Sequence, residues 1–263
     1  MKNESNKLIV VKIGGSTLGE HDTTVQDLVE LQNRGIGTIV VHGGGKLITD
    51  WQKRLGIATR FVRGKRVTDK TSLEVAVSVL AGLVNKEIVA AINRLGGRAM
   101  GISGVDGALI ESSVEDAELG YVGRIDKINS TPASVLLEAG YIPVIAPIGF
   151  HRTKKADEAV LMLNINADTV AGELAAVFKA GMLVFLTDVD GVHDKAGRML
   201  SRLSPAEAET LVKGGVASGG MIPKLEACLR SLQAGATAHI IDGRKARALV
   251  ELVGGEGGGT VIK

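Results

Sequence analysis

The apolar positions of this chain follow two different periods. Short runs of apolar, often β-branched residues stopped by glycine or acidic residues have the pattern of buried parallel strands. Between them, apolar residues recur three and four positions apart, which predicts helices. The strand-like runs lie at 7–15, 37–45, 141–149, 182–192, 236–242 and 257–263. The helical patterns lie at 24–35, 46–56, 71–97 and 131–140, with two more helices expected around the strand at 236–242.

Three stretches combine elements. Residues 60–69 predict a short hairpin with a turn at Gly64, 98–112 predict two strands around a glycine turn, and 159–181 predict a strand followed by a helix. Strands that alternate with helices throughout predict a three-layer α/β/α sandwich with a mainly parallel central sheet. No low-complexity linker interrupts the chain, so any two lobes are expected to form one continuous structural unit.

The composition excludes several classes of function. Of the 263 residues, 45% are hydrophobic, 23% charged and 3% aromatic, and the net charge is +2. This balance is that of a globular protein without the aromatic platforms or basic surface of a nucleic-acid or membrane partner. The single cysteine, Cys228, excludes a disulfide framework and a cysteine-based metal site. We see no signal-peptide core and no apolar run of membrane-spanning length, so we expect a cytoplasmic protein.

Glycine-rich turns follow the first two strands, in "VKIGGS" and "VVHGGGKLIT". The second turn lacks the spacing of a P-loop, and the dinucleotide-binding pattern G-x-G-x-x-G is absent from the sequence. "HGGG" also occurs in the oxyanion turn of esterases, but the G-x-S-x-G elbow that such an enzyme requires is missing. Ligands of parallel sheets bind beyond the carboxyl ends of the strands, where both turns fall. We therefore interpret Gly43–Gly45 as a backbone site for an anion rather than as a plain turn.

The complete set of motifs resembles the amino acid kinase family, and in particular its acetylglutamate branch. "VVKIGGS", "VVHGGGK", "GKRVTD", "GLVNKEIV", "NINADTVAGELA", "LTDVDGV", "GGMIPKL" and "GTVI" occur in family order from residue 10 to 262. The resemblance implies transfer of a phosphoryl group from ATP to the γ-carboxylate of N-acetyl-L-glutamate, the second step of arginine biosynthesis. It also implies a substrate-binding lobe at 1–179 and a nucleotide-binding lobe at 180–263.

The resemblance assigns catalysis to Lys12, Lys224 and Asp168. A carboxylate acceptor is already ionised at neutral pH and needs no general base. Its reaction with a polyphosphate is hindered by like-charge repulsion, which positive charge and N–H donors relieve. Lys12 and Lys224 would supply that charge, and Asp168 would hold both lysines in place. Lys46, in contrast, is interpreted as part of the first turn of a helix.

The remaining site residues fall into two groups. The acceptor substrate is expected to contact Gly43, Gly44, Gly45, Arg66 and Asn164, with Arg66 on its α-carboxylate. The nucleotide is expected to contact Gly14, Gly15, Asp188, Asp190 and Lys224. Magnesium is expected mainly through the ATP phosphates, with no metal held by the protein alone.

Oligomeric state and regulation are less constrained by the sequence. Arginine-inhibited members of the family carry an extra N-terminal helix, for which six residues before the first strand leave no room. Glu251, however, stands where the inhibitor-binding segment has its acidic residue. We expect an arginine-insensitive homodimer with helix 71–97 near the interface, and a regulatory partner of the PII type is neither indicated nor excluded. Two alternatives stay open: a kinase for carrier-protein-linked aminoadipate or glutamate, and a non-catalytic effector-sensing module.

Overall fold

The computed structural model describes residues 8–14, 23–62, 64–152 and 160–263. Its central feature is a sheet of eleven strands with the order β13-β15-β14-β10-β1-β2-β8-β6-β7, to which β5 and β9 add by pairing with β8. The strands are β1 (Leu8–Ile13), β2 (Gly37–His42), β5 (Ala99–Gly104), β6 (Ile110–Val114), β7 (Gly123–Ile128), β8 (Ile142–His151), β9 (Met162–Asn164), β10 (Met182–Thr187), β13 (Arg202–Leu203), β14 (Thr237–Asp242) and β15 (Thr260–Ile262). Most neighbours are parallel; β6–β7, β8–β9 and β14–β15 are antiparallel.

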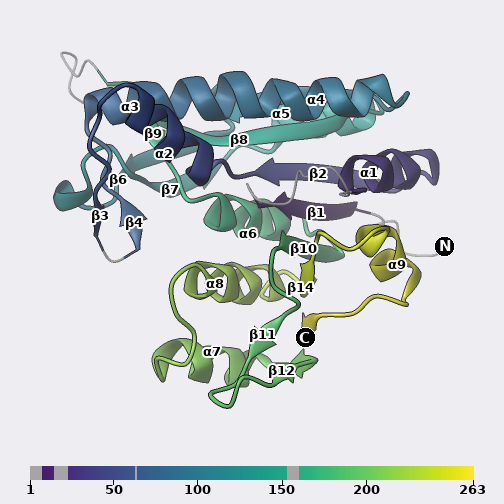
Figure 1. Ribbon diagram of the computed structural model, residues 1–263. Coiled ribbons are helices and arrows are strands. Elements are labelled where there is room, and N and C mark those ends of the chain that lie inside the picture. Colours follow the sequence, from purple (N-terminus) through teal and green to yellow (C-terminus); the bar gives the residue numbers. More distant parts are fainter. Residues whose placement is uncertain (1–7, 15–22, 63, 153–159) are drawn as a thin grey trace.

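Helices cover both faces of this sheet, which confirms the predicted three-layer architecture (Figure 1). One face carries α1 (Thr24–Asn33), α2 (Gly45–Arg54), α3 (Lys70–Val77), α4 (Asn85–Arg94) and α9 (Ala248–Gly254). The other carries α5 (Thr131–Glu138), α6 (Ala167–Val177), α7 (Pro205–Lys213) and α8 (Met221–Leu232). Each face has its own cluster of buried apolar side chains, because successive residues of a strand point to opposite sides.

The predicted elements recur with small shifts of their ends. The hairpin at 60–69 forms from β3 (Phe61–Val62) and β4 (Lys65–Arg66). Between β5 and β6 the chain turns at Gly107, whose φ of 58° suits glycine. A second hairpin, β11 (Val192–His193) with β12 (Met199–Leu200), and the helix α7 were not predicted.

The long helix predicted at 71–97 is continuous from Lys70 to Arg94, but its centre, Ser78–Val84, is π-helical. Asp69 caps its start by accepting a hydrogen bond from the Ser72 N–H at 2.7 Å. By length and composition alone this helix could cross a membrane, so the expectation that no apolar stretch reaches that length is wrong. One side of the helix packs into the core of the sheet, with Leu80 and Ile88 buried, as expected of a core helix.

The sheet does not break between the two expected lobes. Strand β10 lies parallel to β1 along its whole length, so the chain before and after residue 180 shares one sheet (Figure 1). Helix α6, which precedes that point, packs against α8, which follows it. The continuity is that of a single structural unit, and the division of tasks between lobes stays a prediction.

Candidate active site

Lys12 reaches the site because of strand alternation. Ile9, Val11 and Ile13 of β1 point into one core, whereas Val10 points into the other. Lys12 therefore shares the face of Val10, which α6 covers. It is flanked by Val41 of β2 and Phe185 of β10 and is 8% exposed. A buried ammonium group at such a position needs a partner of opposite charge.

Asp168 is that partner, and it contacts both predicted lysines. Lys12 Nζ lies 2.9 Å from Asp168 Oδ1, and Lys224 Nζ lies 3.3 Å from Asp168 Oδ2. Within the described part of the chain no well-aligned hydrogen bond reaches Oδ1, so the first contact is an ion pair rather than a directed hydrogen bond. The Lys224 ammonium also donates to the Gly220 carbonyl at 3.2 Å. We call these three residues the lysine–aspartate cluster.

Local structure holds the two helices of the cluster in register. Asn166 caps α6 by accepting hydrogen bonds from the N–H groups of Asp168 and Thr169. One turn further, a Cβ on Gly172 would lie 2.8 Å from the Cα of Ala227 in α8. The missing side chain lets the two helices approach closely, which places Asp168 and Lys224, each about one turn N-terminal of that contact, within reach of one another.

Burial, with the nearby Asp168 charge, raises the pKa of the Cys228 thiol, so this cysteine stays protonated.

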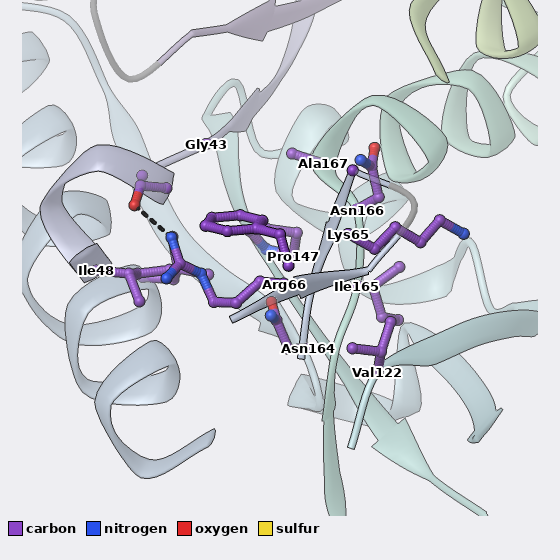
Figure 2. Close-up of a pocket in the computed structure, with 15 residues that line it drawn as sticks. Gly43, Ile48, Lys65, Arg66, Val122, Pro147, Asn164, Ile165, Asn166 and Ala167 are labelled. Carbon is purple, nitrogen blue, oxygen red and sulfur yellow. Dashed lines mark hydrogen bonds between the residues drawn. The ribbon is translucent and has the colours of Figure 1, made fainter. Parts of the chain in front are cut away.

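A cavity of about 220 Å³ opens beside the cluster. Figure 2 shows Arg66, Asn164, Asn166 and Ala167 around it, with the glycine turn at one side. Its lining comprises Gly43, Gly44, Gly45, Ile48, Phe61, Gly64, Lys65, Arg66, Leu80, Val122, Pro147, Asn164, Ile165, Asn166 and Ala167. All five residues expected to contact the acceptor therefore border one cavity. Asn166 and Ala167 directly precede Asp168 in the chain, so this end of the lining is next to the lysine–aspartate cluster, whose three side chains do not themselves border the cavity.

Arg66 is held in place by α2. Its guanidinium donates to the Gly45 carbonyl at 2.8 Å (Figure 2), and also to Gln52 Oε1 at 2.6 Å and to Thr49 Oγ1 at 2.8 Å. The Phe61 ring lies 4.9 Å from its Cζ. Burial lowers the pKa of Arg66, but a guanidinium remains charged at neutral pH. The arginine is thus an ordered positive group at the cavity wall.

The residues expected on the nucleotide side are more scattered. Gly14 follows β1, donates its N–H to Leu186 O at 3.2 Å and borders a second cavity, which the glycine turn separates from the first. Gly15 lies outside the described residues. Asp188 and Asp190 are exposed beyond the end of β10, and Asp190 Oδ1 lies 3.2 Å from His193 Nε2. Glu251 borders a small cavity with Asp190.

Some residues of the site were not predicted from the sequence. Thr49 and Gln52 hold Arg66. Both lie on one face of the helix that follows the glycine turn, and this helical spacing in the sequence could have indicated them as site residues. His42, just before the glycines, bonds to the buried Asn85 of α4. Its burial follows from the position of β2 inside the sheet, where both faces of the strand are covered, but no local pattern indicates Asn85 as its partner.

Two histidines with lowered pKa values, the buried His42 and the half-buried His239, predict a loss of stability in acid. Burial, aided by the charges of Lys12 and Lys86, lowers the pKa of His42 to about 4, and burial likewise lowers that of His239 to about 4. Both rise to about 6.5 on unfolding, so the unfolded chain binds more protons below that pH. The histidine contribution is complete above pH 6.5 and is lost as the pH falls toward 4. We expect His42 alone to lower the free energy of unfolding by up to about 2 kcal/mol between pH 7 and 5. Urea unfolding at pH 7 and at pH 5 measures this change in the free energy of unfolding. An unchanged urea midpoint between the two pH values would contradict the prediction.

The chemistry of this arrangement is that of an anion site. The Arg66 guanidinium and the N-terminus of α2 border the cavity, and the two ammonium groups of the lysine–aspartate cluster lie next to one end of its lining. Helix N-termini favour anions. Among residues 8–14, 23–62, 64–152 and 160–263, no group of three or more His, Cys, Asp or Glu side chains is placed to hold a metal ion. The fold and site define a class: a three-layer α/β protein with positively charged groups and a glycine turn at the carboxyl ends of its parallel strands, an arrangement suited to anionic ligands.

Comparison with known proteins gives the family within that class. The sequence model of the amino acid kinase family matches residues 7–242, and the chain belongs to this family. An acetylglutamate kinase from Dehalococcoides mccartyi is 46% identical over 262 residues, covering 99% of this chain and 96% of that protein.

Solved structures agree on the fold. The smu.665 protein of Streptococcus mutans superposes with a TM-score of 0.82 at 26% identity, covering 98% of both chains. The N-acetylglutamate synthase of Neisseria gonorrhoeae, bound to coenzyme A and N-acetyl-glutamate, gives a TM-score of 0.82 at 24% identity, covering 97% of this chain and 59% of that one. The fold alone therefore occurs in proteins with different activities, and function has to be argued from the site.

Proposed function

We propose that this protein phosphorylates the γ-carboxylate of N-acetyl-L-glutamate with ATP. The main observation in support is the lysine–aspartate cluster. It lies next to one end of a cavity that is lined by the glycine turn, Arg66 and Asn164. Relatives named acetylglutamate kinase match nearly the whole chain at 46% identity, which supports this acceptor over a carrier-linked one. A pure effector-binding module would not need the paired lysines on Asp168.

The reaction needs positive charge more than acid–base chemistry. An oxygen of the ionised γ-carboxylate attacks the γ-phosphorus of ATP, a new O–P bond forms, and the bond from the γ-phosphorus to the bridging oxygen breaks. The electron pair of that bond leaves with ADP, and no proton is transferred. Both reactants are anions, so groups that concentrate positive charge on the transferred phosphoryl lower the barrier.

Each group of site residues has its own role in the proposed phosphoryl transfer. Lys12 and Lys224 would contact the phosphoryl group from two elements, while Asp168 holds both ammonium groups without touching the phosphate. Arg66 and Asn164 would bind the acceptor, and the Gly44 and Gly45 N–H groups at the start of α2 would face the reacting oxygens. Gly14, Gly15, Asp188 and Asp190 are assigned to the nucleotide side. Magnesium supplies charge neutralisation when bound to the ATP phosphates.

The test is an acceptor panel. ADP release is measured with ATP, magnesium and, in turn, N-acetylglutamate, glutamate and aminoadipate, and hydroxylamine traps the acyl phosphate as a hydroxamate. We expect turnover with N-acetylglutamate and little with the free amino acids. Turnover with another acceptor but not with N-acetylglutamate would overturn the proposed substrate.

Lys224→Ala should lower kcat on the order of 10-fold to 10²-fold, below the usual loss for one buried donor because its side chain is more exposed than that of Lys12. KM for N-acetylglutamate should change less than threefold, since Arg66 and Asn164 are untouched. Steady-state kinetics with each substrate varied in turn separates the two constants. An effect on KM alone would show that Lys224 serves binding rather than the transition state.

We also propose a homodimer. Trp51 of α2 and Leu55, which directly follows α2, are exposed at 37% and 58%, and with Val75 and Val79 they line an apolar groove against the long helix. Such a patch on the surface is typical of a protein interface. Light scattering should give twice the chain mass, and Leu55→Glu should reduce it to one chain. A monomeric parent protein would contradict the proposal.

A further inference from the structure

A buried histidine stands directly before the three glycines. His42 ends β2, is 1% exposed and has no role in the chemistry above. Its Nδ1 lies 3.0 Å from the Gly43 carbonyl oxygen, and its Nε2 lies 3.2 Å from Asn85 Nδ2. The long helix thus contacts the glycine turn through this ring.

The contacts determine where the proton of the ring lies. A carbonyl oxygen accepts hydrogen bonds and never donates, so Nδ1 must carry the proton. The Asn85 amide nitrogen also donates to Val144 O at 2.9 Å, and Asn85 Oδ1 accepts from Lys86 Nζ at 3.0 Å. The amide orientation is therefore fixed, and Nε2 of His42 is the acceptor. The low pKa that burial and the nearby Lys12 and Lys86 charges give His42 keeps this single neutral tautomer at physiological pH.

The hydrogen bond from His42 to the Gly43 carbonyl fixes the orientation of a peptide in a turn of three consecutive glycines. Glycine has no Cβ to restrict rotation, so the peptides of this turn have little intrinsic preference for one orientation. In a trans peptide the C=O and N–H point in opposite directions. Holding the Gly43 carbonyl to the imidazole therefore turns the Gly44 N–H away from the ring. Leu80 packs closely against Gly44, where a Cβ would lie 2.7 Å from Leu80 Cδ2.

We propose that His42 is a positioning residue that orients the Gly43–Gly44 peptide, so that the Gly44 N–H faces the reacting oxygens. The inference rests on the proposed function, in which this N–H is one of the donors to the attacking carboxylate or the phosphoryl group. Asn85 orients His42 in turn. The contact that matters is the hydrogen bond from Nδ1 to Gly43 O, and the bond from Asn85 serves to fix the tautomer.

Two variants separate these bonds. The amide nitrogen of asparagine falls near the position of Nδ1, and the amide of glutamine reaches that of Nε2. We expect His42→Gln, which loses the Gly43 bond, to lower kcat 10-fold to 100-fold with KM for ATP within threefold. His42→Asn, which loses the Asn85 bond instead, should recover most of that kcat. His239→Gln, at a half-buried histidine of β14 away from the site, is the control and should stay within twofold.

The outcomes are distinct. If the kcat values of both His42 variants merely follow their melting temperatures, or if both stay within twofold of the parent, His42 is a structural core residue and the proposal fails. The ¹⁵N chemical shifts of the imidazole in the parent protein give a measurement that needs no folded variant: Nδ1 should stay protonated from pH 5 to 8, and a proton on Nε2 would overturn the inference. The acceptor panel on the parent protein tests the proposed function separately, because the tautomer does not depend on which substrate is used.

Discussion

Replacing Lys12 by alanine is expected to lower kcat by about 10³-fold while KM for N-acetylglutamate changes less than threefold. The ammonium lies on the apolar β1, 2.9 Å from Asp168 Oδ1, in a site that excludes most water. Charge in such surroundings acts strongly on developing negative charge. Because Lys12 would act on the phosphoryl group in the transition state rather than on the resting acceptor, the loss should appear in kcat.

The measurement must separate this charge from packing. Lys12→Met keeps much of the side-chain volume in the strand and should lose activity as severely as Lys12→Ala. Lys46→Ala is the matched control, because Lys46 follows the same glycine turn but lies exposed in the first turn of α2. It should stay within threefold of the parent protein. An unchanged kcat with a raised KM in Lys12→Ala, in a variant whose circular dichroism shows a folded chain, would contradict the assigned role.

Much of the fold could be predicted because its signals are local. The apolar runs ending in glycine or aspartate located β1, β2 and β10, and the strand edge on which Lys12 and the glycine turn meet followed from parallel topology. The elements that were missed had weaker patterns. Helix α7 begins with a capping box between Ser204 and Glu207, and the S-x-x-E pattern of this box, visible in the sequence, marks the start of a helix. Strand β7, largely polar, gave no apolar run.

The residues of the candidate site could likewise be predicted in part from the sequence. Lys12, Asp168 and Lys224 came from motifs, but the distances that join them depend on two helices that approach where Gly172 lacks a side chain. The support of Arg66 by Gln52 and Thr49, and of His42 by Asn85, joins residues far apart in sequence. The helical spacing of Thr49 and Gln52 places both on one face of α2, but which residue they contact, like the contact of His42 with Asn85, depends on the packed tertiary structure.

Arg66→Ala is expected to raise KM for N-acetylglutamate about 100-fold and to leave kcat within threefold. Three of the five N–H donors of the guanidinium, including both of Nη2, are engaged with Gln52, Gly45 and Thr49. The two that are left, Nε–H and one Nη1–H, lie on different edges of the guanidinium, so one of them can donate to a carboxylate of the acceptor. A hydrogen bond to a charged group contributes about 1.5–3 kcal/mol, and one bond at the upper end of that range corresponds to roughly the expected loss. The α-carboxylate does not change its charge during the reaction, so the interaction is equal in the ground and transition states and affects KM rather than kcat.

Two further variants make this prediction specific. Arg66→Lys keeps the charge but loses the planar fork and its bonds to α2, so KM should rise by about tenfold. Arg60→Ala removes an exposed arginine that precedes the same hairpin and does not border the cavity, and its kinetics should match those of the parent protein. KM for ATP should stay constant in all three, because Arg66 lies on the acceptor side of the glycine turn. A rise in KM for ATP equal to that for N-acetylglutamate would mean that Arg66 shapes the whole site, and a loss confined to kcat would place it on the transferred phosphoryl group instead.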